Sequence, residues 1–64
     1  MANPIMRYFD YTHLPPKLQA VSNQFYQVAN WVDVGLPDGA EKSTALRKLL
    51  EAKDAAVRAA LDVP

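Results

Sequence analysis

The segment from Pro37 to Leu61 constrains the fold of this 64-residue chain more than any other, because it predicts one long helix. Pro37 discourages a helix from running in from upstream. Asp38 can accept backbone N–H groups of the first turn, and Glu41 three residues later can reach back, which together make a capping box. We therefore expect a helix over residues 38–61.

One face of this helix combines apolar side chains with a hydroxyl and an ammonium. Residues spaced alternately by three and four positions share a helix face. Polar groups in line with buried residues are costly unless they find partners, so the pattern predicts a polar site at a helix–helix contact. The residues of this row are Ser43, Leu46, Leu50, Lys53, Val57 and Ala60.

A second helix is predicted over residues 15–34. Pro15 and Pro16 suit the first turn of a helix, whereas Gly35 and the proline that follows end it. The short link to the next helix predicts an antiparallel hairpin. The apolar positions that we expect to form its core face are Leu18, Val21, Phe25, Val28 and Val32.

Residues 1–14 form an aromatic-rich arm, in which we expect Tyr8 and Phe9 to pack against the hairpin. The predicted fold class is therefore all-α, with one domain that consists of a short arm and an antiparallel two-helix hairpin. A chain of this length buries little surface and has no cysteine for a disulfide or a thiolate metal site. Self-association is the remaining route to stability.

A stripe of small side chains on the second helix supports a homo-oligomer, since it would let a helix of another protomer approach closely. The alternative interpretation is that alanine is simply a good helix former. The stripe consists of Ala45, Leu49, Ala52, Ala56 and Ala59.

The formal net charge of zero argues against binding to polymeric nucleic acid through a general basic field. The first ten residues lack the apolar segment of a signal peptide, and no run is long enough to span a membrane. We expect a cytoplasmic protein with no membrane contact and no metal or other cofactor.

The residues favour binding over catalysis. His13 has no accompanying nucleophile, so we expect no enzyme activity. Lys42 and Ser43 lie in the second turn of a helix and Arg47 one turn on, where donors favour a phosphate. Lys53 must extend to solvent, pair with a carboxylate such as Asp54 of another chain, or meet a ligand phosphate. The candidate ligand-binding residues are Tyr11, His13, Lys42, Ser43, Arg47, Lys53 and Arg58.

Several short motifs resemble the helical-hairpin domain of phage nucleotide sponges, which sequester the second messengers of the CBASS and Thoeris immune systems. The similarity would cover roughly Tyr11 to Leu61. The motifs are Pro37-Asp38, Glu41-Lys42-Ser43, Ala45-Leu46, Lys48-Leu49 and Glu51-Ala52, with Tyr11 followed by Leu14 and Pro15.

The resemblance implies a homohexamer in the infected bacterial host that holds cyclic dinucleotides or cyclic trinucleotides between protomers. It implies that Tyr11 stacks on a base, that Arg58 contacts trinucleotide phosphates and that Lys42 with Ser43 holds phosphates. Relatives place a lysine midway along the first long helix, where this chain has Asn23-Gln24-Phe25-Tyr26 and no cation. Either another protomer supplies that charge, through Lys17 or Lys42, or dinucleotide binding is weak or altered.

Two other classes of binding protein remain open. The same helices would suit a protein–protein adaptor or an antitoxin-like oligomerisation module, which predicts no small-molecule binding. A compact helix-turn-helix DNA-binding protein would place residues 42–48 in a groove, but acidic residues beside the basic ones argue against it.

Overall fold

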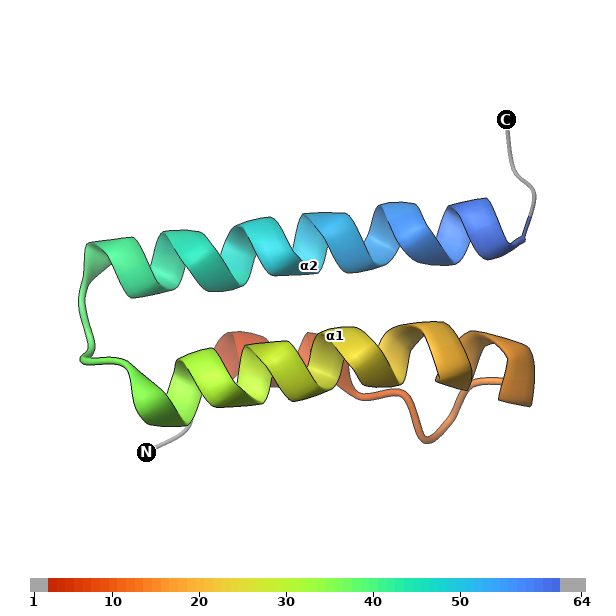
Figure 1. Cartoon of the computed structure of the whole chain (residues 1–64), viewed down its shortest axis with the longest axis horizontal. Coiled ribbons are helices and arrows are strands. Elements are labelled where there is room, and N and C mark those ends of the chain that lie inside the picture. The colour runs from red at the N-terminus through yellow and green to blue at the C-terminus, as the bar shows by residue number, and fades with distance from the viewer. Residues whose placement is uncertain (1–2, 62–64) are drawn as a thin grey trace.

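The computed structural model describes residues 3–61 as three helical elements (Figure 1). A short 3-10 helix, η1, spans Pro4–Phe9, and two long helices follow, α1 over Pro16–Gly35 and α2 over Ala40–Ala60. The two long helices lie side by side and antiparallel, with η1 next to α1. The all-α helical hairpin predicted from the sequence is therefore confirmed, and no strand occurs within residues 3–61.

The ends of α1 follow from its prolines and its glycine. Pro16 occupies the first turn, where a missing N–H costs nothing, and the carbonyl of Pro15 accepts from the amides of Leu18 and Gln19, both at 2.9 Å. The helix ends at Gly35, after which the amide of Leu36 donates to the carbonyl of Val32 at 3.2 Å. These boundaries each lie one residue beyond the expected ones.

The start of α2 differs from the prediction, and the capping box is wrong. The helix begins at Ala40, and the residue that precedes it, Gly39, has no side chain to cap it. The Asp38 carboxylate accepts instead from Lys42 Nζ at 2.8 Å. A charged donor is a stronger partner for a carboxylate than a backbone amide, and the Lys42 side chain is already directed into this turn by two carbonyls.

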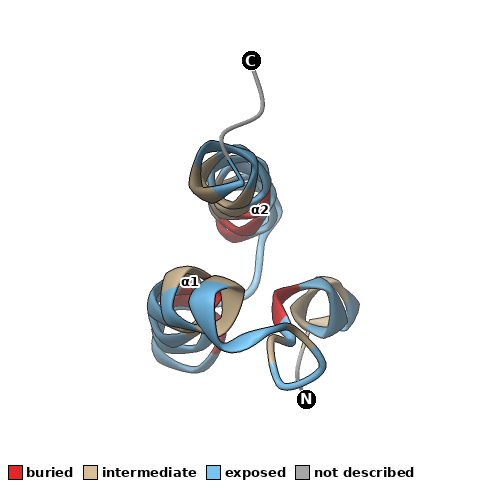
Figure 2. Cartoon of the chain, turned by 90° about the vertical axis from the view of Figure 1, so that its right-hand side faces the viewer, coloured by how far each residue is buried: buried red, intermediate tan, exposed pale blue. Residues whose placement is uncertain are grey.

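All three elements contribute to a small core. Figure 2 shows η1 and α1 side by side with α2 above them, and the buried segments of each face the centre. The confirmed prediction for the arm is Phe9, which is completely buried, whereas Tyr8 is exposed and the expectation that it packs inward is wrong. The buried apolar side chains are Phe9, Ala29, Val32, Leu46 and Leu50.

The buried face of α1 is rotated from the one predicted by heptad spacing. Of the expected core positions, Val32 is buried and Val28 is exposed, whereas Ala29, Ser22 and Asp33 are buried. The rotation follows from the fold, since α1 packs against both η1 and α2 and not against one partner helix.

The predicted buried row of α2, from Ser43 to Ala60, is confirmed at its centre and wrong at its start. Leu46 and Leu50 are buried, and Lys53 is mostly buried, but Ser43 is exposed. Lys42 occupies the inner position in its place. The shift of one residue arises because the Lys42 ammonium finds acceptors at the end of α1 and in the loop that the shorter Ser43 hydroxyl would not reach.

Candidate functional site

Basic side chains gather along a groove between η1 and α2. The chain has seven lysines and arginines in all. Two pockets adjoin in this groove, and the side chains of Arg7 and Tyr8 line both of them. The five basic residues that line one or both pockets are Arg7, Arg47, Lys48, Lys53 and Arg58.

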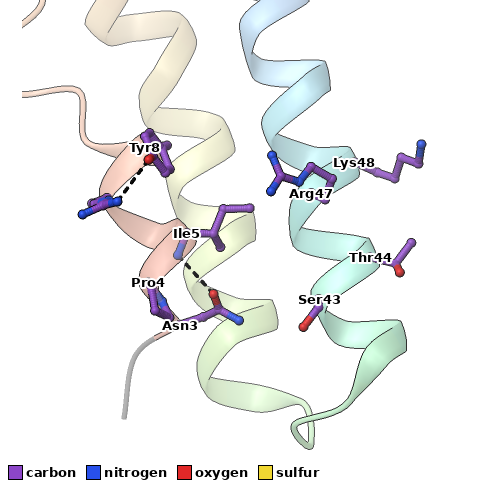
Figure 3. A pocket seen from close by; sticks show the side chains of 9 residues that line it. Asn3, Pro4, Ile5, Tyr8, Ser43, Thr44, Arg47 and Lys48 are labelled. Atoms are coloured by element: carbon purple, nitrogen blue, oxygen red, sulfur yellow. Dashed lines mark hydrogen bonds between the residues drawn. The ribbon is translucent and has the colours of Figure 1, made fainter.

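The first of these, the loop-side pocket, has a volume of about 610 Å³ and lies between η1 and the first half of α2 (Figure 3). Ser43 and Arg47 extend from α2 toward η1, whereas Lys48 and Thr44 extend from the other side of the helix. None of the lining residues carries a carboxylate. Its lining residues are Asn3, Pro4, Ile5, Arg7, Tyr8, Ser43, Thr44, Arg47 and Lys48.

The two arginines of the loop-side pocket have no ionic partner among residues 3–61. Arg7 Nη2 donates to the Tyr8 hydroxyl at 3.1 Å, and its guanidinium lies 5.0 Å from the centre of the Tyr8 ring. Arg47 forms no salt bridge within the described part of the chain. Arginine can bind a phosphate through two parallel N–H groups, so these side chains suit an anion in the pocket.

The second pocket, the far pocket, lies toward the end of the hairpin opposite the loop and has a volume of about 460 Å³. Lys53 is only 13% exposed, and its ammonium is 3.3 Å from Asp54 Oδ1 of the same chain. The carboxylate that pairs with Lys53 is thus Asp54 of its own chain, whereas we expected Asp54 of another chain. The lining residues are Arg7, Tyr8, Asp10, His13, Leu14, Ser22, Lys53, Asp54, Val57 and Arg58.

Both carboxylates at the far pocket have partners. Asp10 accepts from the backbone and the hydroxyl of Thr12 at 3.1 and 3.0 Å, and these hydrogen bonds lower the pKa of the Asp10 carboxyl. His13 Nδ1 lies 3.9 Å from the same carboxylate. Within residues 3–61, no three histidine, cysteine, aspartate or glutamate side chains come together as a metal site would require.

Lys42 has a structural position away from the groove pockets. It is only 7% exposed, and its ammonium donates to the carbonyls of Asp33 at 2.6 Å and Leu36 at 3.1 Å and to Asp38 Oδ1 at 2.8 Å. An ammonium has three N–H donors, and all three are used here. Lys42 therefore has no free N–H group to donate to a ligand.

Tyr11 also lies outside the two pockets. Its ring meets the ring of Tyr26 edge to face, with centroids 5.6 Å apart and an angle of 63°. The structure thus divides the seven candidates. Ser43 and Arg47 line the loop-side pocket, His13, Lys53 and Arg58 line the far pocket, and Tyr11 and Lys42 lie elsewhere.

Sequence reasoning missed Arg7, Tyr8 and Ser22 as pocket residues. Arg7 and Tyr8 reach the groove because η1 docks beside α2, and no periodic pattern in the arm predicts that docking. Ser22 did carry a signal, since it lies seven residues before Ala29 and therefore shares its buried face.

Comparison of the chain with models of protein families, with curated proteins and with solved structures found no match. The resemblance to nucleotide sponges therefore stays a hypothesis that depends on the motifs quoted above. Neither of the two long helices of residues 3–61 is apolar enough over a sufficient length to cross a membrane.

Proposed function

We propose that this protein sequesters cyclic dinucleotides or cyclic trinucleotides without catalysis and so suppresses CBASS-type antiphage signalling in an infected host. The observation that supports this proposal is the gathering of basic side chains in one groove of a chain with zero formal net charge. A local concentration of positive charge on a neutral protein favours a small anion over a polymer, because a polymer needs a longer basic surface.

The dimensions and the composition of the groove also favour a nucleotide. Pocket volumes of about 610 and 460 Å³ fall within the range typical of small-molecule sites. Arginine and hydroxyl donors suit phosphates. The Tyr8 ring between the two pockets offers a flat surface, and stacking on an aromatic ring contributes about 1–3 kcal/mol per base.

Self-association is part of the proposal. Only a few apolar side chains are buried in the core, whereas Trp31 is 64% exposed and Val34 is 77% exposed. Val28 lies on the same face of α1, three residues before Trp31. In a symmetric assembly, which the resemblance makes a hexamer, one arginine per protomer would become a ring of charges, and a bound anion would stabilise that ring.

The test is a panel of cyclic dinucleotides and trinucleotides measured by calorimetry and thermal shift. We expect Arg47→Ala and Arg58→Ala each to weaken binding by about ten- to a hundredfold, since a hydrogen bond to a charged group contributes about 1.5–3 kcal/mol. Tyr11→Ala tests the stacking role that the resemblance implies. Lys17→Ala removes an exposed cation outside both pockets and should bind as the wild type does if the groove holds the ligand. Weaker binding in this variant would indicate instead that Lys17 of another protomer supplies a charge.

Binding without catalysis is tested on the same samples. After incubation and denaturation, the released ligand should have its original mass. A shortened or linear product would replace sequestration with a nuclease activity. No binding of any member of the panel would refute the proposed function.

A protein–protein adaptor is the second candidate, and the exposed apolar side chains on α1 favour it. It predicts that Trp31→Glu abolishes partner binding while cyclic nucleotides produce no thermal shift.

A further inference from the structure

The far pocket contains a buried hydroxyl without a partner. The side chain of Ser22 on α1 is completely buried, and its Oγ has no hydrogen-bond partner among the described residues. Buried hydroxyls in helices usually donate to a carbonyl of the preceding turn or to water. Because an unsatisfied buried hydroxyl costs free energy, Ser22 marks a position where an incoming acceptor would be stabilised.

The basic groups around the same pocket also have donors to spare. The mostly buried Lys53 ammonium has three N–H groups, and its ion-pair partner within residues 3–61 is the half-exposed Asp54 carboxylate at 3.3 Å. Arg58 forms no salt bridge within the part of the chain that is described. Hence Ser22 from α1 and two cations from α2 meet at one pocket with more donors than acceptors.

The walls of the far pocket restrict the kind of ligand. Leu14 and Val57 supply apolar surface, and the Asp10 carboxylate is already engaged by Thr12. A ligand that satisfies the free donors needs several acceptor oxygens and negative charge, together with an apolar or flat portion. A phosphate ester has this combination.

Building on the function proposed above, we propose that the Ser22 hydroxyl is a ligand-binding group that donates to a phosphate oxygen held by Lys53 in the far pocket. The Ser22 hydroxyl orients the phosphate through a hydrogen bond, whereas the Lys53 ammonium supplies the positive charge. The Asp54 carboxylate is half exposed. Its ion pair with the Lys53 ammonium can therefore break when the phosphate binds, because water then hydrates the carboxylate.

The decisive variant is Ser22→Ala, because the proposal predicts opposite effects on stability and on binding. Removing a hydroxyl that has no partner should leave the Tm of the ligand-free protein equal to or above that of the wild type. The same change should weaken binding of a cyclic nucleotide by about tenfold, since one hydrogen bond to a charged acceptor is lost. Circular dichroism and calorimetry measure the two effects.

The results separate a binding role from a structural one. Unchanged affinity in Ser22→Ala would overturn the proposal. A lowered Tm would overturn it as well, with or without weaker binding, because it would show that the hydroxyl has a partner inside the protein.

Lys53→Met and Lys17→Met form a matched pair that tests the charge. Both remove an ammonium and keep a long side chain, but Lys17 is exposed and lines neither groove pocket. We expect at least a tenfold loss of affinity for Lys53→Met and no change for Lys17→Met. Equal affinities in the two variants would place the phosphate elsewhere.

Inorganic pyrophosphate, added as a second probe, separates this proposal from the identity of the messenger. Binding of pyrophosphate that depends on Ser22 and Lys53, with no binding of cyclic nucleotides, would uphold the phosphate site and refute the proposed function. Cyclic-nucleotide binding that is unchanged in Ser22→Ala would uphold the proposed function and refute the role of Ser22. If neither probe binds, both proposals fail.

Discussion

Among the individual residues, Lys42 carries the clearest structural role. A buried ammonium is costly unless its donors are satisfied, and here two carbonyls and a carboxylate satisfy them. The buried Asp33 carboxylate, 3.9 Å away, adds a second negative charge and itself accepts from the amide of Asn3 at 3.0 Å. One side chain thus joins the end of α1, the loop and the start of α2.

Replacing Lys42 by methionine should destabilise the protein strongly. The change leaves Asp33 buried without its counter-charge, and breaking a buried pair costs on the order of 3 kcal/mol or more. Urea unfolding followed by circular dichroism measures the loss. Lys48→Met, which removes an exposed lysine paired with Glu51 at 3.7 Å, should change stability by less than about 1 kcal/mol. Similar losses in the two variants would contradict the role assigned to Lys42.

Stability should also depend on pH through Asp38. The hydrogen bond from Lys42 lowers the pKa of Asp38 below its ordinary value of 3.8. The unfolded chain therefore binds more protons than the folded one near that pH, and stability rises as the pH rises through this window. We expect the Tm to fall as the pH drops below 3.8, and to fall less in Asp38→Asn. Parallel curves for the two proteins would show that the fall arises from other carboxylates.

At the level of elements, η1 determines whether the groove exists. A six-residue 3-10 helix is not stable alone, so η1 depends on its anchors. Asn3 Oδ1 caps it by accepting from the amide of Ile5 at 3.1 Å, and Phe9 inserts into the core. Because η1 forms one wall of both pockets, its docking connects core packing to ligand binding.

Phe9→Ala should therefore lower both stability and affinity. Truncating a buried phenylalanine costs about 3–5 kcal/mol, and undocking of η1 would remove Arg7 from the groove. Tyr8→Ala truncates the neighbouring exposed ring and should change the free energy of unfolding by less than about 1 kcal/mol. Chemical unfolding compares the two variants. Equal stability losses would show that Phe9 does not anchor the arm.

How far the sequence predicts this fold depends on the element. The prolines at the start of α1 and the glycine at its end act through local backbone geometry, so the sequence predicts its boundaries to within one residue. The start of α2 could not be predicted in this way, because Asp38 can accept either from the backbone amides of the first turn or from Lys42. Only the folded loop shows that Lys42 is the preferred partner. The docking of η1, and with it the pocket roles of Arg7 and Tyr8, depends on contacts between distant segments that leave no periodic pattern.

For the molecule as a whole, the two long helices leave apolar surface that one chain cannot cover. The stripe of small residues on α2 is partly used within the chain, since Ala45 and Leu49 pack against the core. The larger uncovered side chains are on α1, where Val28, Trp31 and Val34 follow one another at intervals of three residues. This arrangement favours α1 as the face that associates.

Two charge insertions distinguish the faces on which copies associate. Trp31→Glu should shift the assembly toward smaller species in sedimentation equilibrium, because it places a carboxylate in the apolar face of α1. Ala52→Glu, on the exposed part of the small-residue stripe, should leave the assembly unchanged. If Ala52→Glu shifts the assembly and Trp31→Glu does not, the association surface lies on α2. A compact wild-type monomer at micromolar concentration would exclude association altogether.

The uneven distribution of the core along the hairpin has a consequence for hydrogen exchange. The fully buried Ala29 and Leu46 and the Lys42 contacts lie nearer the loop, whereas Ser22 is the one fully buried residue that the described part of the two long helices contributes to the far pocket. Backbone amides should thus exchange slowly in the helical residues 29–35 and 44–50 and progressively faster toward residues 16–22 and 53–60. A ligand would then enter where opening costs least, and its arrival would slow exchange most at that end.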